Sequence, residues 1–180
     1  MPTKFDQTKV KEPTYFKEGN IPAHSDHVCF AGAEEAAKGG SSFRYSLDGL
    51  WKFSYAKNIS LAIPGFEAEK MDCHNWDDIR VPAHIQMEGY DIPQYVNVQY
   101  PWDGHAEIKP GQIPEDFNPV GSYVKYFFVP ERMQGEKIFI SFQGVESAFA
   151  LWVNGTYVGY SGDSFTPTEF ALYNTNDSSN

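Results

Sequence analysis

Apolar and polar residues alternate along several short stretches of the chain, a pattern typical of half-buried β-strands. In residues 50–56 the alternation collects three aromatic side chains on one face, Trp51, Phe53 and Tyr55. Residues 137–142 turn three apolar side chains inward in the same way, Ile138, Ile140 and Phe142. Residues 122–129 carry large apolar groups on both faces, which predicts a strand in the centre of a sheet. Residues 67–80, by contrast, form a polar, acidic stretch that ends in Val81-Pro82.

A hairpin signal follows in the last third of the chain. Residues 148–153 and 156–160 are strand-like and are separated by Asn154-Gly155, a pair that suits a type I′ turn because both central residues need positive φ. The single predicted helix, residues 31–38, is short and ends at Gly39-Gly40. Short strands separated by turns predict an all-β sandwich or barrel.

The rest of the chain predicts an arm, a long loop and a tail. Residues 1–30 are irregular, and residues 82–121 hold six of the 12 prolines. A long Pro-rich loop is usually functional or part of an interface. We therefore expect three segments: an extended arm with the short helix in residues 1–45, a β-sandwich in residues 46–172, and a disordered or truncated tail in residues 173–180.

Composition and charge narrow the range of partners. The 180-residue chain has a net charge of −10, which disfavours nucleic acid and anionic membranes because both bind clusters of Lys and Arg. No stretch approaches the roughly 20 apolar residues of a membrane-spanning helix, and the N-terminus lacks the apolar segment of a signal peptide. We therefore expect a cytoplasmic protein. Its two cysteines, Cys29 and Cys73, either form one disulfide or remain reduced.

Several motifs together resemble family 2 glycoside hydrolases. They are residues 46–53 (SLDGLWKF), residues 81–86 (VPAHIQ) and the hairpin region 144–159, which runs from Gly-Val through Leu-Trp-Val-Asn-Gly to Val-Gly. Two further motifs resemble the large bacterial β-galactosidases in particular, namely residues 89–101 (GYDIP through YVNVQYP) and residues 159–164 (GYSGDS).

The resemblance covers about residues 15–170 and implies the first domain of such an enzyme, a jelly-roll, galactose-binding-like β-sandwich that precedes a catalytic barrel. It implies that the complete enzyme hydrolyses terminal β-galactosides with retention, uses two barrel glutamates, and needs magnesium and sodium. This chain would then hold no catalytic residue and no metal ligand, because the family's sodium-holding aspartate follows the point where this chain departs from its relatives. The resemblance also implies a homo-oligomer that this domain helps to assemble.

Asn97 is the one substrate-binding candidate. In the matching family loop an asparagine reaches the galactose pocket, and an amide that both donates and accepts hydrogen bonds suits a sugar hydroxyl. The alternative for Asn97 is a hydrogen bond to its own loop backbone. Trp102 lies in the same Pro-rich loop and is a candidate for stacking on a sugar, although an interface or packing role is favoured.

Other chemistry-bearing residues form no recognisable site in the sequence. His24, His27 and Cys29 look like metal ligands, but no second cluster completes a zinc site. Carboxylates are plentiful in residues 67–116. Retaining glycosidases need two carboxyl groups about 5–5.5 Å apart, and nothing singles out such a pair, so we interpret these carboxylates as a solvated acidic surface.

Two alternatives stay open. The chain could be a stand-alone carbohydrate-binding module, which would need an exposed cluster of aromatic and polar residues and measurable affinity for sugar. It could instead be a structural oligomerisation domain in which Asn97 never meets substrate.

Overall fold

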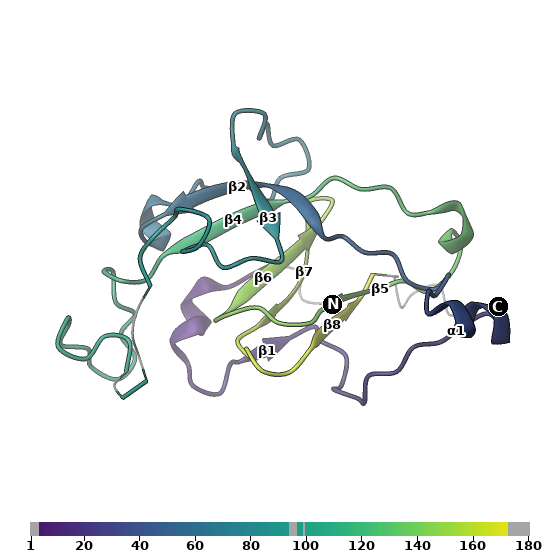
Figure 1. Cartoon of the computed structure of the whole chain (residues 1–180). Coiled ribbons are helices and arrows are strands. Elements are labelled where there is room, and N and C mark those ends of the chain that lie inside the picture. The colour runs from purple at the N-terminus through teal and green to yellow at the C-terminus, as the bar shows by residue number, and fades with distance from the viewer. Residues whose placement is uncertain (1–3, 94–96, 99, 173–180) are drawn as a thin grey trace. The chain divides into compact units, whose positions relative to one another are not determined.

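The computed structural model describes residues 4–93, 97, 98 and 100–172 of the chain. These residues belong to two compact units, one formed by Met1–Ser46 with Phe128–Asn180 (unit 1) and the other by Leu47–Phe127 (unit 2). The all-β prediction is confirmed, because every strand pairing in the described residues is antiparallel and their only α-helix is α1 (Ala33–Lys38) (Figure 1). The predicted boundaries after residues 45 and 172 stay predictions, and the predicted tail lies outside the described residues.

Unit 1 contains two small sheets. The first has the order β1-β7-β6, with β1 at Lys17–Glu18, β7 at Thr156–Ser161 and β6 at Phe149–Val153. The second pairs β5 (Phe139–Phe142) with β8 (Thr168–Ala171). Two 3₁₀ turns, η1 (Gln7–Lys11) and η3 (Glu131–Met133), also belong to this unit.

The sequence predicted an irregular N-terminal arm, but part of the arm forms regular structure. It contributes strand β1, which pairs antiparallel with β7. The two strands come so close that a Cβ at Gly159 would meet the carbonyl oxygen of Glu18 and the ring of Phe170. A strand of two residues is too short to show a period of two, so the hydrophobic pattern could not reveal it.

The predicted hairpin and helix end are confirmed. Strands β6 and β7 are joined through Asn154 and Gly155, whose φ angles are 49° and 75°. Helix α1 ends at Gly39, which takes the left-handed conformation with φ of 73°. Strand β8 was missed, because residues 168–171 carry only one large apolar residue, Phe170, and follow a turn-like segment.

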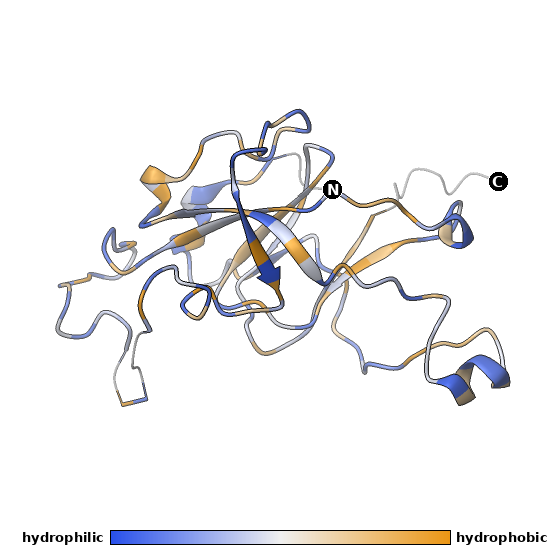
Figure 2. Ribbon diagram, turned by 45° about the horizontal axis from the view of Figure 1, so that its top comes forward, coloured by the Kyte–Doolittle hydropathy of each residue, from blue (hydrophilic) through white to orange (hydrophobic). Residues whose placement is uncertain are grey.

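The core of unit 1 is aromatic. Phe170 is fully buried on β8, and its ring centroid lies 6.0 Å from that of Phe149 and 6.4 Å from that of Phe142. In β5 exposed and half-buried residues alternate, as predicted, with Ile140 and Phe142 on the half-buried side. Figure 2 shows this mixture of apolar and polar residues along the strands.

The arm is fastened to the β6–β7 hairpin by a cluster of tyrosines around one carboxylate. Oε2 of Glu18 accepts hydrogen bonds from the hydroxyl of Tyr15 at 2.7 Å and from that of Tyr157 at 2.9 Å. The ring of Tyr15 stacks on Tyr160 with a centroid distance of 5.0 Å, and Phe5 packs against Tyr160 at 5.8 Å. The contacts therefore join the first 20 residues to a hairpin far along the sequence.

Unit 2 is built on one sheet of order β3-β2-β4, with β3 at Asp77–Val81, β2 at Gly49–Ala56 and β4 at Val120–Val124. A short 3₁₀ turn, η2 (Ile59–Leu61), follows β2. The central strand is β2, whose Phe53 is 1% exposed, as is Ile79 of β3. Cys73 is also buried in this unit, whereas Cys29 of unit 1 is exposed, and neither forms a disulfide.

One prediction for unit 2 was wrong, and one strand was missed. The strand predicted at residues 122–129 ends at Val124 and is not central, because within the described residues β4 pairs with β2 alone. Apolar groups on both faces do not prove burial, and Tyr126 beyond the strand is 66% exposed. Strand β3, at the end of the polar, acidic stretch, was missed, because its polar residues point outward around buried Ile79.

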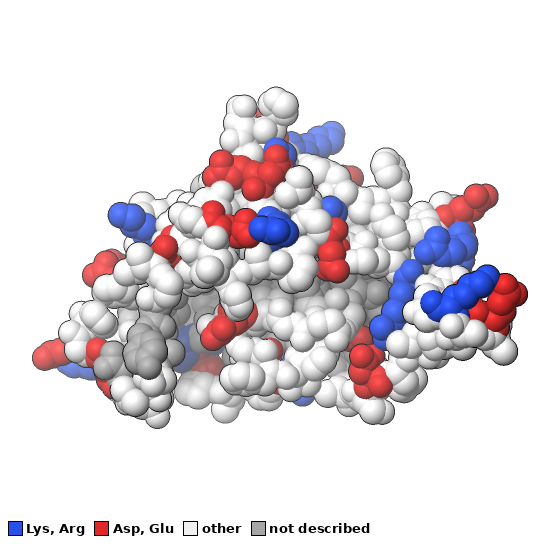
Figure 3. All heavy atoms as spheres, in the orientation of Figure 1, with Lys and Arg blue, Asp and Glu red and all other residues white. Residues whose placement is uncertain are grey.

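Acidic and basic side chains are interspersed on the face seen in Figure 3. Lys38 and Glu34 of α1 form an ion pair at 2.7 Å. Lys52 and Asp78 pair across β2 and β3 at 3.0 Å. Among the residues that the structure describes, no helix is both long and apolar enough to cross a membrane.

Candidate functional site

The candidate site is the Pro-rich loop, residues 82–119, that connects β3 to β4 in unit 2. Asn97, the substrate-binding candidate, lies exposed at a bend in this loop. Residues 94–96 and 99 lie outside the described residues. The described residues before and after this segment make the contacts that hold the loop in place.

On the N-terminal side, Tyr90 anchors the loop to the sheet. Its ring packs edge-on against Phe53 with a centroid distance of 4.7 Å and lies 6.1 Å from the ring of Tyr55. Its hydroxyl donates a hydrogen bond to Oδ2 of Asp77 at 2.9 Å. Burial raises the pKa of the Tyr90 hydroxyl, and the hydrogen bond to Asp77 raises it further.

A compact turn leads into Tyr90. The backbone N–H of Tyr90 donates to the carbonyl of Ile85 at 3.0 Å, and Glu88 forms an ion pair with Arg80 of β3 at 3.2 Å. The next residue, Asp91, has φ of 57°, which is uncommon for a residue with a Cβ. Burial first, and then the charge of Asp91 and a hydrogen bond with it, raise the pKa of Tyr55 on β2.

On the C-terminal side, the loop is tied to itself. The indole N–H of Trp102 donates to the carbonyl oxygen of Phe117 at 3.3 Å, and the ring of His105 lies 4.6 Å from that of Phe117. The backbone N–H of Tyr100 donates to Oδ2 of Asp103 at 3.3 Å. Trp102 is half-buried and its polar group is used inside the loop, an arrangement that suits packing better than a sugar platform.

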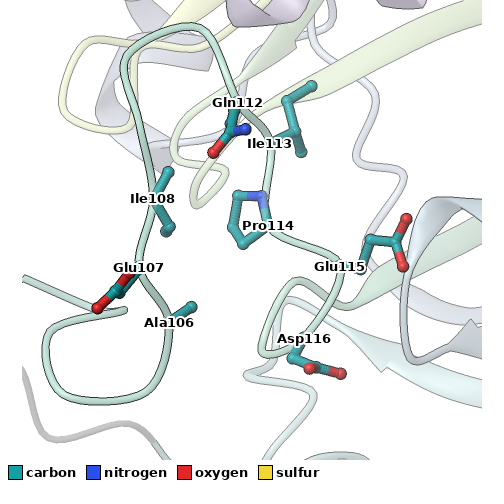
Figure 4. Close-up of a pocket in the computed structure, with 8 residues that line it drawn as sticks. All are labelled: Ala106, Glu107, Ile108, Gln112, Ile113, Pro114, Glu115 and Asp116. Atoms are coloured by element: carbon teal, nitrogen blue, oxygen red, sulfur yellow. The ribbon is translucent and has the colours of Figure 1, made fainter.

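One pocket opens inside the same loop. It has a volume of about 350 Å³ and is lined by residues 106–108 and 112–116. Figure 4 shows Ile108 and Pro114 directed into the space, while the carboxylates of Glu107 and Glu115 point away from it. Asn97 is not among the lining residues, so the pocket and the candidate substrate residue are separate features.

Several carboxylates that the sequence left unassigned take part in local contacts. Asp77 accepts from Tyr90, Asp78 pairs with Lys52, and Glu88 pairs with Arg80. These contacts fix strand β3 and the base of the loop. They support the interpretation of the acidic residues as a surface feature.

The histidines near the arm are not arranged as a metal site. Nε2 of His24 lies 2.9 Å from Oε2 of Glu169, and Nδ1 lies 3.0 Å from the carbonyl oxygen of Ser25. These two contacts raise the pKa of His24, the Ser25 carbonyl contributing more. Within the described residues, no group of three His, Cys, Asp or Glu side chains could hold a metal ion.

Sequence reasoning missed Tyr90 as a structural anchor of the site. The segment Gly89-Tyr90-Asp91 was noticed only for its resemblance to β-galactosidases. A large aromatic residue inside a Pro-rich loop was the available signal, because such a side chain seldom stays in solvent without a packing partner. The partner itself, Phe53, could not be inferred from the sequence.

Comparison with known proteins identifies the family. The family model described as "Glycosyl hydrolases family 2, sugar binding domain" matches residues 44–176. The chain is 53% identical to a β-galactosidase of Halalkalibacterium halodurans, a match that covers 96% of this chain and 17% of the relative. It is 43% identical to a β-galactosidase of Streptococcus thermophilus, over 92% of this chain and 16% of the relative. A β-galactosidase large subunit of Latilactobacillus sakei is 40% identical, over 89% of this chain and 28% of the relative.

The similarity thus extends over nearly all of this chain, while the chain spans less than a third of the length of each of these relatives. The family model includes the whole sheet of unit 2, the loop that carries Asn97, and strands β5 to β8 of unit 1. The chain therefore belongs to glycosyl hydrolase family 2, as its sugar-binding domain.

Proposed function

We propose that this chain is the N-terminal domain of a β-galactosidase that hydrolyses terminal β-galactosides such as lactose. The observation that carries this proposal is the 53% identity to a protein named β-galactosidase over 96% of the chain. Relatives from two further genera, at 43% and 46% identity, carry the same name. Identity at this level between this chain and the matching domain of the relatives supports the same role for both domains within a larger enzyme.

The domain walls the galactose pocket and supplies Asn97 to it. Two features support this role: Asn97 is exposed, and its loop is fastened by Tyr90 on one side and by Trp102 on the other. A side chain presented from a held segment loses less conformational entropy when it binds a ligand. The amide can accept a hydrogen bond from one sugar hydroxyl and donate one to another.

Bond cleavage belongs to the part of the enzyme outside this chain. A retaining glycosidase needs a nucleophilic carboxylate and an acid/base carboxyl group on either side of the scissile bond. In our proposal both are glutamates of a catalytic barrel, and this chain alone is inactive. Magnesium and sodium are cofactors of that complete enzyme. No group of three His, Cys, Asp or Glu side chains among the described residues could hold a metal ion, and in our proposal both ions are held by the rest of the enzyme.

Assembly and location complete the proposal. The complete enzyme is a homo-oligomer to whose contacts this domain contributes. Phe165 supports such a protein contact because its large apolar side chain is 98% exposed. The turn that carries it is held in place, since the backbone N–H groups of Phe165 and Thr166 both donate hydrogen bonds to Oδ1 of Asp163. The unpaired thiols of Cys29 and Cys73 suit the reducing cytoplasm.

The substitution Asn97→Ala in the full-length enzyme tests the proposed role. We expect kcat/KM for lactose to fall tenfold or more, equivalent to roughly 1.4 kcal/mol of transition-state binding. The matched control is Asn75→Ala, which removes another exposed amide from unit 2 and should leave kcat/KM unchanged. An Asn97→Ala enzyme with wild-type kcat/KM would instead support the structural oligomerisation domain.

A further inference from the structure

We propose that Asn154 is a site of spontaneous deamidation, and that the modified turn loosens the N-terminal arm from the β6–β7 hairpin. The reaction changes one exposed asparagine covalently and needs only water as a co-reactant. The turn and the arm both belong to unit 1. The inference does not depend on whether Asn97 meets a sugar, so it goes beyond the proposed function and is tested separately from it.

The residue that follows an asparagine decides how readily it deamidates. In this reaction the backbone nitrogen of the following residue attacks the carbonyl carbon of the asparagine side chain. Glycine leaves that nitrogen open to approach, because it has no Cβ to crowd it. Asn154 is the only asparagine of the chain that is followed by glycine. The sequence therefore singles out this position.

The structure leaves both reacting groups free. Asn154 and Gly155 are exposed at the tip of the hairpin, and among the described residues the Asn154 amide has no hydrogen-bond partner. Asn58, by contrast, uses its Oδ1 to accept hydrogen bonds within its own turn. In a two-residue turn the closing hydrogen bond joins the flanking residues, which here are the paired Val153 and Thr156. The N–H of Gly155 is therefore not needed for the turn.

The chemical steps balance without an oxidant or a reductant. Base removes the proton from the backbone nitrogen of Gly155, and this nitrogen forms a bond to Cγ of Asn154. The bond from Cγ to the side-chain nitrogen breaks, and ammonia leaves with a proton from the solvent, which gives a cyclic imide. Water then adds to one of the two imide carbonyls and opens the ring. One opening gives aspartate, and the other gives isoaspartate, in which the main chain runs through the former side chain.

The attack requires the backbone of Asn154 to rotate out of its turn conformation. That conformation has φ of 49°, which is uncommon and unfavourable for a residue with a Cβ. The turn also lies at the end of the strand pairing, where local opening costs the least free energy. Both features favour the brief opening that the reaction needs.

The strand ends beside this turn hold the N-terminal arm. Trp152 and Tyr157 lie opposite each other in the register of β6 and β7. The ring centroid of Phe5 lies 5.8 Å from that of Trp152 and 5.7 Å from that of Tyr157. The hydroxyl of Tyr157 also donates to Oε2 of Glu18 at 2.9 Å. Isoaspartate lengthens the main chain of the turn and so displaces these strand ends, and we expect the contacts of Phe5 and Glu18 to weaken.

Peptide mapping by mass spectrometry tests the first step in the full-length enzyme, incubated at mildly alkaline pH. The peptide that covers residues 150–160 should gain the mass difference between an amide and an acid, and L-isoaspartyl methyltransferase should methylate it. Asn75 is the internal control, because it is also exposed but is followed by Trp76. We expect Asn154 to react about tenfold faster than Asn75, a difference of about 1.4 kcal/mol in activation free energy. Equal rates at the two asparagines, or an Asn154 that stays unmodified, would overturn the proposal.

Hydrogen exchange on the same incubated enzyme tests the second step. Amide exchange in the peptide that contains β1 should be faster than in a fresh sample, with unchanged exchange in β2. Unchanged exchange of β1 in enzyme modified at Asn154 would contradict the loosening of the arm.

Asn154→Gly is the matched variant, because Gly-Gly also suits a type I′ turn and has no amide to lose. After the same incubation its β1 exchange should equal that of a fresh sample. If β1 exchange rises equally in this variant, the incubation itself loosens the arm and the proposed link to deamidation is wrong. Should Asn154→Gly fail to fold, Asn154→Gln serves instead, since its longer side chain closes the corresponding ring much more slowly.

Discussion

The two units of the chain hold their segments together in different ways. In unit 1 the arm, the hairpin and β8 come from distant parts of the sequence and meet in a buried set of aromatic rings and tyrosine hydroxyls around Glu18 and Phe170. In unit 2 a single sheet supports a loop longer than any of its strands. Among the described residues, Tyr90 and the Glu88–Arg80 ion pair hold this loop to the sheet, and the loop also makes contacts with itself.

The difference suggests that unit 1 mainly stabilises the fold, whereas unit 2 presents an exposed side chain from a loop. Buried packing between distant segments makes unit 1 costly to open, because separating the segments exposes apolar surface and leaves polar groups without their partners. A loop with few anchors can place an exposed residue such as Asn97 beyond the sheet. Changes in unit 1 should therefore alter stability, and changes around the loop of unit 2 should alter binding.

The largest expected effect on stability is Phe170→Ala. Phe170 is fully buried, and removing a large core ring typically costs about 3–5 kcal/mol in the free energy of unfolding. Denaturant unfolding of the 180-residue chain measures the loss. Phe165→Ala is the matched control, because Phe165 is 98% exposed and should change stability by less than about 0.5 kcal/mol. Equal losses in the two variants would contradict the core assigned to unit 1.

A smaller effect is expected for Glu18→Gln. The substitution keeps an acceptor oxygen but removes the negative charge of the carboxylate that accepts hydrogen bonds from both tyrosine hydroxyls. We therefore expect the free energy of unfolding to fall by about 1–2 kcal/mol. The control is Glu12→Gln in an exposed part of the arm. No difference between the two variants would show that the arm is held by its aromatic rings alone.

The same cluster should make the stability of unit 1 decrease at alkaline pH. Burial first, and then hydrogen bonds with Tyr15 and Glu18, raise the pKa of Tyr157 above its usual 10.0. The folded chain therefore keeps a proton that the unfolded chain releases. The stabilisation is complete below pH 10 and is lost as the pH rises above it. Absorbance titration of tyrosine at rising pH should show a late-ionising group in the wild type, and Glu18→Gln should bring its ionisation to lower pH.

The smallest effect is expected at His24. The Ser25 carbonyl and Glu169 raise its pKa above 6.5, so the folded chain binds the proton more tightly than the unfolded chain. The resulting stabilisation is present below pH 6.5 and fades as the pH rises through the folded-state pKa. Protection of the Ile21 amide, which donates to the carbonyl of Glu169 at 3.0 Å, is its exchange rate relative to the intrinsic rate at each pH. This protection should fall over that pH range in the wild type and lose this dependence in His24→Ala. His74→Ala, an exposed histidine of unit 2, should leave the dependence unchanged.

Local patterns in the sequence predicted the features that depend on the conformational preferences of neighbouring residues, such as turns, helix ends and long strands. The Asn154-Gly155 turn needs positive φ at two adjacent residues, and α1 needs a residue that tolerates the left-handed conformation where it stops, so both could be predicted from residue types. Strand β2 could be predicted because its alternating pattern extends over eight residues. The motifs of the hairpin and of the Pro-rich loop were enough to indicate the family.

Only the tertiary structure decided which distant segments meet. Strand β1 exists because Gly159 lets the arm approach β7, and no property of residues 17 and 18 alone announces that pairing. Tyr90 is an anchor because the fold brings Phe53 and Asp77 beneath it. Such contacts join residues far apart in the chain, and a sequence pattern records the character of a side chain but not the neighbour that will cover it.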